Sequence, residues 1–275
     1  MKISEVLIDS GDAEYAEDAL FLRRCGKNIM AGVLDGVSGP YHPSSGPELF
    51  NGETGGQIIV NVAVGAMQEA ANWNPDGIFN EANGKVREKL LSLGIARNLP
   101  GASFAFAWID CTTKMLTIIQ GGDSYALIEL RGKIVATGNQ VYEHDHRLLK
   151  AKEEFEQEFP NNRDKVWDKL VPLTAALQLK HVNNSHDPFG YASLNGQCEV
   201  LDCLNKMEFP LDNVLTLLLF TDGLVPFGII GRERKARMFD SYKKVGLKGI
   251  LKETRGKKFQ RFTDGPEAVG IAIVF

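Results

Sequence analysis

The sequence predicts an α+β fold in which groups of antiparallel strands are separated by pairs of helices. Short apolar runs bounded by turn residues occur near residues 3–35, 101–136 and 214–220, and such runs are typical of buried strands. Two segments with helical spacing follow one another between the first two groups. Because the strands come in runs rather than singly between helices, the pattern favours α+β layers over βαβ units.

The composition is that of an ordinary globular protein. The chain has 275 residues, 44% hydrophobic and 24% charged, with a net charge of −4, and this length allows one large domain or two small ones. A mildly acidic chain offers no electrostatic footprint for nucleic acid, and no apolar run is long enough to span a membrane. The N-terminus lacks the apolar segment of a signal peptide, so we expect a cytoplasmic protein. The cysteines show no zinc spacing and suit isolated buried thiols in a reducing compartment; they are Cys25, Cys111, Cys198 and Cys203.

The first part of the chain is predicted to pair two short strands around a hairpin turn. Residues 3–9 form a first strand and residues 11–18 an acidic turn. A strand over 19–23, the turn Cys25-Gly26-Lys27 and an apolar strand ending at Asp35 follow. This order is typical of an antiparallel pair.

A helix pair is predicted next. Residues 40–52 are rich in Pro, Gly and Ser and form a loop. Helical spacing then runs from Thr54 to Trp73, with Thr54 in the position of an N-cap. After the break at Asn74-Pro75-Asp76, a second apolar helical face extends from Ile78 to Leu91. So short a connection predicts antiparallel packing.

The rest of the chain contains further strands and helices. Strands over 101–110, 114–120, 125–130 and 133–136 are expected to form an antiparallel meander. The remaining expected elements are a helix from Leu148 to Phe159, a helix from Val166 to Leu177 that contains Pro172, a polar loop or flap over 181–196, a strand over 214–220, a basic surface helix over 235–251 and an apolar strand over 268–275.

Three of the predicted strands deliver an aspartate at the C-terminal end. They run into Asp35-Gly36, Gly122-Asp123-Ser124 and Thr221-Asp222-Gly223. Each alone is a common turn sequence, but two of them lead into prolines rather than into a second hairpin strand. Gathered at one end of a core, such carboxylates repel each other unless a cation lies among them. Hard oxygen ligands of this kind suit Mg²⁺ or Mn²⁺.

The order of these motifs resembles the PP2C (PPM) family of metal-dependent serine/threonine protein phosphatases, in a divergent bacterial form. The resemblance extends from Tyr15 to Phe275 and depends on the number, order and spacing of short motifs. It implies one domain over 1–275, built as an α-β-β-α sandwich with two central antiparallel sheets flanked by helix pairs. The matching motifs are Glu17-Asp18-Ala19, Asp35-Gly36, the helix pair, Gly101-Ala102-Ser103, Gly122-Asp123-Ser124, Thr221-Asp222-Gly223-Leu224 and an acidic turn before the last strand.

The resemblance also implies a site that holds two Mn²⁺ or Mg²⁺ ions, with a third, weaker site in some members. Asp35 would bridge the two ions and Asp222 would bind the first, so both count as catalytic. The other implied ligands are the carbonyl of Gly36, Glu17 through water, Asp18 beside it, and Asp123 for the third ion. Taken alone, Glu17 and Asp18 fit a solvated acidic turn, and Asp123 fits a turn residue.

The last metal ligand of the family has no direct match. Aligned on the final strand, Pro266 falls where the ligand aspartate is expected. Either Asp264 serves, through a locally longer turn, or Glu267 replaces it. We favour Asp264.

Two other positions of the family's site also differ. Val37 stands where many eukaryotic members have a histidine after Asp-Gly, and Ala13 where they have an arginine that binds the substrate phosphate. Arg23 and Arg24 lie nearby in sequence and are candidate substrate-binding residues. The alternative is an exposed pair on a strand.

The expected activity is hydrolysis of phosphoserine or phosphothreonine in a protein substrate by a water that two metal ions activate. A two-metal site offsets charge on the attacking and leaving oxygens and lowers the pKa of a bound water from 15.7 toward about 7. One alternative is a weakly active or inactive relative that acts as a binding module, and another is a phosphatase of small phosphorylated metabolites. His144-Asp145-His146 is expected to be a surface loop rather than a metal site, because no third ligand lies at a suitable offset.

Overall fold

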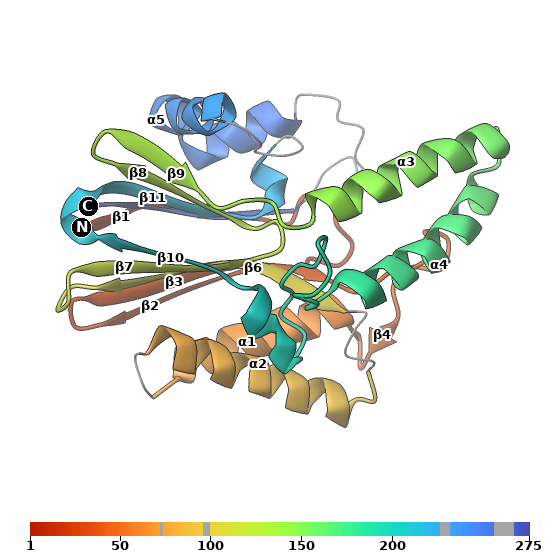
Figure 1. The fold of residues 1–275 in the computed structure, drawn as a ribbon, viewed down its shortest axis with the longest axis horizontal. Helices are drawn as coiled ribbons and strands as arrows, with labels where there is room; N and C mark the ends of the chain where they lie inside the picture. The colour runs from red at the N-terminus through yellow and green to blue at the C-terminus, as the bar shows by residue number, and fades with distance from the viewer. Residues whose placement is uncertain (72–73, 96–99, 226–231, 256–266) are drawn as a thin grey trace.

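Two antiparallel sheets packed face to face position everything else in the molecule. A computed structural model describes residues 1–71, 74–95, 100–225, 232–255 and 267–275, and Figure 1 shows the two stacked sheets. Sheet A has the strand order β1-β12-β11-β8-β9, with β1 (Lys2–Asp9), β12 (Ala268–Val274), β11 (Val214–Phe220), β8 (Tyr125–Leu130) and β9 (Lys133–Ala136). Sheet B has the order β10-β7-β6-β3-β2, with β10 (Asn205–Pro210), β7 (Met115–Gly121), β6 (Gly101–Asp110), β3 (Asn28–Val37) and β2 (Asp18–Cys25). A separate small hairpin joins β4 (Leu49–Phe50) to β5 (Glu53–Thr54).

Helices cover the outer face of each sheet. Helices α1 (Gly55–Glu69) and α2 (Pro75–Ser92) lie on sheet B, and α5 (Arg232–Arg255) lies on sheet A (Figure 1). Helix α5 is divided at Gly246, where φ is 68°. Figure 1 also shows α3 (Tyr142–Glu158) and α4 (Arg163–His181) as a hairpin that projects from one end of the sandwich. The expected α+β fold with α-β-β-α layers is confirmed.

Three apolar layers hold the sandwich together, and strand β6 shows why. Phe104 and Phe106 face the helices α1 and α2, whereas Ala105 and Ala107 face sheet A. Side chains alternate between the two faces of a strand, so a strand covered on both faces must be apolar throughout, and β6 is buried along nearly its whole length. The third layer, between sheet A and α5, contains Phe220 and Phe239. The amphipathic helix α5 thus contributes to the core rather than only to the surface.

Helix α1 begins at a side-chain cap that the sequence predicts. The Thr54 hydroxyl accepts a hydrogen bond from the Gln57 N–H, and the Gln57 side chain accepts one from the Thr54 N–H. This reciprocal pair is a capping box, which satisfies two of the N–H groups that have no partner within the helix. The N-terminus of α1 therefore has a defined position beside sheet B.

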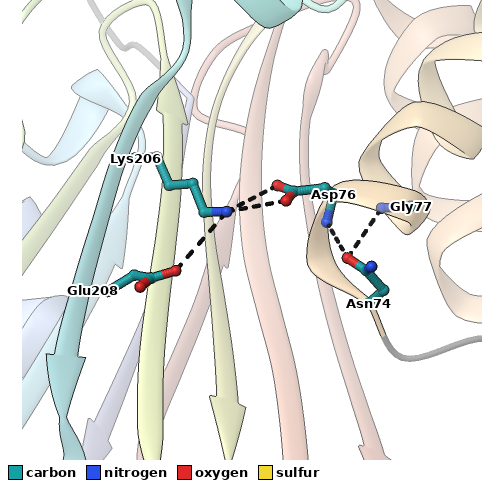
Figure 2. Close-up of polar contacts among 5 residues, drawn as sticks. All are labelled: Asn74, Asp76, Gly77, Lys206 and Glu208. Carbon is teal, nitrogen blue, oxygen red and sulfur yellow. Dashed lines mark hydrogen bonds and ion pairs between the residues drawn. The ribbon is translucent and has the colours of Figure 1, made fainter.

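The edge strand β10 is tied to the start of α2 by charged and polar side chains. Figure 2 shows Lys206 of β10 between Asp76 in the first turn of α2 and Glu208 on its own strand. Its Nζ lies 3.0 Å from an Asp76 oxygen. The side chain of Asn74 caps the same helix by accepting from the N–H groups of Asp76 and Gly77. Strand β10 alternates between half-buried and exposed residues, and no strand was predicted there from the sequence.

The expected meander over 101–136 is wrong, because the chain changes sheets in its middle. Strand β7 pairs with β6 and β10 in sheet B, whereas β8 pairs with β9 and β11 in sheet A. The crossing occurs at Gly122, Asp123 and Ser124, where Gly122 has φ of 72°. A Cβ atom on Gly122 would overlap the Cβ of Ser103. A glycine at this point therefore allows both the left-handed turn and the close approach.

The expectation of a surface loop at His144-Asp145-His146 is also wrong. These residues form the beginning of α3, and His144 is only 4% exposed. Its ring packs edge-on against His181 of α4 and against Tyr191, with centroid distances of 5.8 and 5.4 Å. His144 is therefore part of the packing that joins the α3–α4 hairpin to the following loop.

The cysteines are free, as expected, but they are not buried thiols. Cys25 and Cys198 are exposed, and Cys111 and Cys203 are partly exposed. In the described part of the chain, no helix combines the length and apolar character that crossing a membrane requires.

Candidate functional site

The site begins with two aspartates on neighbouring strands of sheet B. Asp18 of β2 and Asp35 of β3 are direct cross-strand partners, so their side chains emerge on the same face of the sheet. Burial raises the pKa of Asp35 and the negative charge of Asp18 raises it further, so the two carboxyl groups are close enough to interact. On its other side, Asp35 pairs with Ser103 of β6. Asp35 thus lies on the middle one of three adjacent strands, β2, β3 and β6.

A buried threonine connects this pair to sheet A. Thr221 follows β11 and is fully buried. Its hydroxyl donates to the Asp18 carboxylate over 2.6 Å and accepts from the Val269 N–H over 3.0 Å. Asp222 is the next residue, at the start of a short 3₁₀ turn. The hydrogen bond from Thr221 therefore joins the two sheets at their acidic end.

Two glutamates complete the arrangement around Asp18. Glu267, just before β12, accepts hydrogen bonds from the N–H groups of Glu17 and Asp18 over 2.6 and 2.7 Å. The Glu17 carboxylate accepts from the hydroxyls of Ser38 and Thr54. Because Thr54 caps α1, the carboxylate of Glu17 lies at the N-terminus of that helix, where the helix dipole favours negative charge.

Glycine is required beside these acids because the backbone approaches them closely. The Gly36 N–H donates to the carbonyl of Glu17 over 3.1 Å, and a Cβ on Gly36 would lie 2.8 Å from that oxygen. A Cβ on Gly56, in the first turn of α1, would lie 2.7 Å from the Glu17 carboxylate. Side chains at these positions would push the backbone and the acid apart.

The carboxylates perturb one another strongly. Burial raises the pKa of Asp35 well above its usual value, and the negative charges of Asp18, Asp222, Asp123 and Glu267 raise it further. Burial likewise raises the pKa of Asp18, with further increases from Glu267 and Asp222 that the Thr221 hydrogen bond opposes. The strongest charged neighbours of Asp35 are thus all carboxylates. Asp18, Asp35, Asp123, Asp222 and Glu267, from both sheets, share one electrostatic environment.

This donor set fits a hard divalent cation. Buried like charges are costly unless a positive charge compensates them, and carboxylate oxygens are the ligands that Mg²⁺ and Mn²⁺ prefer. Among the described residues, no three Asp, Glu, His or Cys side chains form a group arranged to hold a metal on their own. Mg²⁺ typically takes only one or two carboxylates and completes its shell with water, so the acids present still fit such an ion.

The last ligand stays a prediction. Asp264 and Pro266 lie outside the described residues. Glu267 is described, and one of its oxygens contacts the backbone N–H groups of Glu17 and Asp18. Glu267 therefore supports the loop that carries those acids, whichever residue completes the site.

The two arginines are held away from the acids. Arg23 pairs with Met30, five residues along β2 from Asp18, which corresponds to roughly 16 Å of strand. Its Nη1 donates to the carbonyls of Met67 and Ala70, over 3.2 and 2.6 Å, at the end of α1. Arg24 is the next residue along the strand. Arg23 thus satisfies carbonyls at a helix C-terminus, a role different from the phosphate contact considered from the sequence.

Sequence reasoning missed the hydroxyl groups that orient the acids. Ser38 and Thr221 both contact candidate ligands, and each lies within three residues of an Asp-Gly motif. A serine or threonine close to an Asp-Gly motif was the feature of the sequence that could have indicated these hydroxyl groups. Only the fold reveals which acid each hydroxyl contacts.

Comparison with known proteins identifies the fold. No family model and no curated protein matches the sequence. Among solved structures, a bacterial serine phosphatase is similar at a TM-score of 0.54 and 12% identity, covering 99% of this chain and 98% of that one. The serine/threonine phosphatase Stp1 from Staphylococcus aureus also matches at 0.54 and 12%, covering 100% and 96%. RsbX in complex with magnesium matches at 0.52 and 11%, covering 98% and 91%.

These matches extend over nearly the full length of each chain, with the same two-sheet architecture. At 12% identity, the structural similarity supports the fold alone, and the chemistry has to be argued from the residues of the site. The chain therefore has the fold of the bacterial PP2C-type serine/threonine phosphatases.

Proposed function

We propose that this protein is a metal-dependent phosphatase that hydrolyses phosphoserine or phosphothreonine in protein substrates. The observation that carries the proposal is that Asp18 and Asp35 of sheet B lie close to Asp222, which is in the turn after β11 of sheet A. The similar folds of a serine/threonine phosphatase and of a magnesium-bound protein support both the reaction class and the cation. The cations would be Mg²⁺ or Mn²⁺, with Asp35 and Asp222 as the principal ligands.

Each residue of the site has a role that its contacts support. Asp18, Asp35, Asp222 and the carbonyl of Gly36 would hold the two ions, with Asp123 available for a third. When bound, such ions activate water and offset charge on the phosphoryl oxygens. Thr221 holds Asp18 in place, and Ser38 and Thr54 hold Glu17. Asp18 and Asp35 are half-buried, and this partial removal from water strengthens electrostatic interactions within the site.

Turnover of a chromogenic aryl phosphate tests this function. We expect Mn²⁺-dependent hydrolysis by the wild-type protein and a loss of at least roughly a hundredfold in Asp35→Asn and Asp222→Asn, the scale of removing one strong electrostatic contact. Asp212→Asn, which changes an exposed aspartate near the opposite end of β11, is a matched control and should keep wild-type turnover. Absence of metal-dependent turnover by folded wild-type protein would refute the enzyme assignment.

Calorimetry separates an inactive binding module from an enzyme with a demanding substrate. Wild-type protein that binds Mn²⁺ but does not hydrolyse the aryl phosphate should be assayed with phosphopeptides and with small phosphorylated metabolites. Retention of the fold without Mn²⁺ binding would instead favour the binding module. Preference for a metabolite over phosphopeptides would leave the hydrolase correct and the protein substrate wrong.

A further inference from the structure

A cavity of about 190 Å³ adjoins the acidic end of the sandwich. It lies between the sheet crossing at Asp123 and the base of the α3–α4 hairpin, and residues from both line it. A water molecule occupies about 30 Å³ in the liquid, so the cavity has room for a larger group. The lining residues that matter here are Ser103, Asp123, His144, Asp145, Gln178 and Tyr191.

Two buried polar side chains that line the cavity each carry an atom without a hydrogen-bond partner. His144 is 4% exposed and Gln178 is 8% exposed. Within the described ranges, neither His144 Nδ1 nor Gln178 Oε1 has a partner. Buried polar atoms in folded proteins are almost always paired, and leaving one unpaired is costly. The two residues lie on different helices of the hairpin, so a ligand group that enters between them would reach both side chains.

The charges at the cavity favour a positive ligand. Asp123 and Asp145 both line it, and their negative charges add to burial in raising the pKa of Tyr191. None of the described lining residues is Lys or Arg. Burial, with smaller effects from His181 and Arg147, lowers the pKa of His144 to about 4, so its ring is neutral at pH 7 and does not repel a cation. The unpaired Gln178 oxygen can only accept a hydrogen bond.

We propose that this cavity binds the basic side chain of a lysine or arginine next to the phosphorylated residue of a protein substrate. Asp145 supplies the opposite charge, and Gln178 Oε1 accepts a hydrogen bond from the ammonium or guanidinium group. Asp123 lines the cavity and also belongs to the acid cluster, so the phosphoryl group and the basic side chain occupy adjacent positions. This inference rests on the proposed function, because it assigns part of the substrate of the same site.

Fluorescence anisotropy with labelled peptides tests the subsite without requiring turnover. The peptides carry a non-hydrolysable phosphonate in place of phosphoserine, followed by either lysine or norleucine, and binding is measured with Mn²⁺ present. We expect the lysine peptide to bind the wild-type protein roughly ten- to hundredfold more tightly, the range of a charge-assisted hydrogen bond. That ratio should fall toward one in Asp145→Asn and in Gln178→Leu.

Glu153→Gln is the matched control, because it removes one negative charge from an exposed position on the same helix. It should keep the wild-type ratio. Thermal melting identifies any variant that fails to fold, and the two cavity variants provide independent readings. Equal binding of both peptides by the wild type, or equal ratios in Asp145→Asn and Glu153→Gln, would overturn the subsite. Hydrolysis of the aryl phosphate reports on the proposed function separately, so the two can fail independently.

Discussion

Replacing Thr221 with valine removes the hydrogen bond that joins the two sheets at the acidic end. Thr221 is fully buried, and its hydroxyl donates to Asp18 over 2.6 Å and accepts from the Val269 N–H over 3.0 Å. Valine has nearly the same shape but no hydroxyl, so the substitution leaves the buried N–H of Val269 without that acceptor. It also removes a donor from the half-buried carboxylate of Asp18.

The expected destabilisation is about 3 kcal/mol. A hydrogen bond to a charged group contributes about 1.5–3 kcal/mol, and an orphaned buried donor costs about 1–3 kcal/mol. The two terms overlap, because the carboxylate of Asp18 can become protonated when its donor is lost, so their full sum overestimates the effect. Thr221→Ser keeps the hydroxyl and loses one methyl group, which costs about 1 kcal/mol. The difference between the two variants should therefore be about 2 kcal/mol.

Urea denaturation near pH 7, in the presence of a chelator, measures both variants against the wild type. The midpoint should fall further in Thr221→Val than in Thr221→Ser, with unchanged m-values. Repeating the pair in an Asp18→Asn background should shrink the difference, because the charged acceptor is then absent. Equal free energies of unfolding for the valine and serine variants would show that the hydroxyl contributes nothing to joining the sheets.

Three other substitutions test the acid cluster, the α3–α4 hairpin and the 3₁₀ turn that follows β11. Without metal, Asp35→Asn should raise the free energy of unfolding by about 1–2 kcal/mol, because it relieves repulsion among closely placed carboxylates. It should also reduce the shift in thermal midpoint that Mn²⁺ produces. Lower stability of the metal-free variant would contradict this. In the folded protein the pKa of His144 is about 4, below its ordinary value of 6.5. Between pH 6.5 and pH 4 the unfolded chain therefore binds more protons than the folded protein. The free energy of unfolding should fall by up to about 3 kcal/mol as the pH drops across this range. His144→Gln should flatten that part of the urea-midpoint profile, whereas His146→Gln at an exposed position of the same helix should leave it unchanged; identical profiles would refute the assignment. Gly223→Ala should destabilise the protein by roughly 3 kcal/mol, measured by urea denaturation, because its Cβ would overlap the carbonyl oxygen of Glu267; a wild-type midpoint would show that the turn adapts.

Local patterns predicted much of the secondary structure. The predicted strands over 101–110 and 214–220 coincide with β6 and β11, because continuous apolar runs of this length are distinctive when both faces of a strand are buried. Thr54 caps α1 as expected, since a capping box lies entirely within four consecutive residues. The edge strand β10 was missed because one of its faces is exposed and its apolar residues are few.

The candidate site was predicted in part, and the rest depended on distant contacts. The motifs Asp35-Gly36 and Thr221-Asp222 indicated strands that end in acids, and the fold brings those acids together. Arg23 lay close to the acids in sequence, but the direction of β2 carries its side chain to the end of α1. Burial of His144 could not be predicted either, because it depends on packing against α4 and the loop that follows it.

By itself, the sequence determined the periodicity of each strand and helix, the caps and turns, and the kind of chemistry that its aspartates suit. These properties depend on neighbours a few residues away. The tertiary structure alone decided that β7 and β8 belong to different sheets, and that Thr221 would contact Asp18 across 203 positions of the chain. The alternation of side chains specifies which face of a strand is buried, but it does not specify which strand lies beside it.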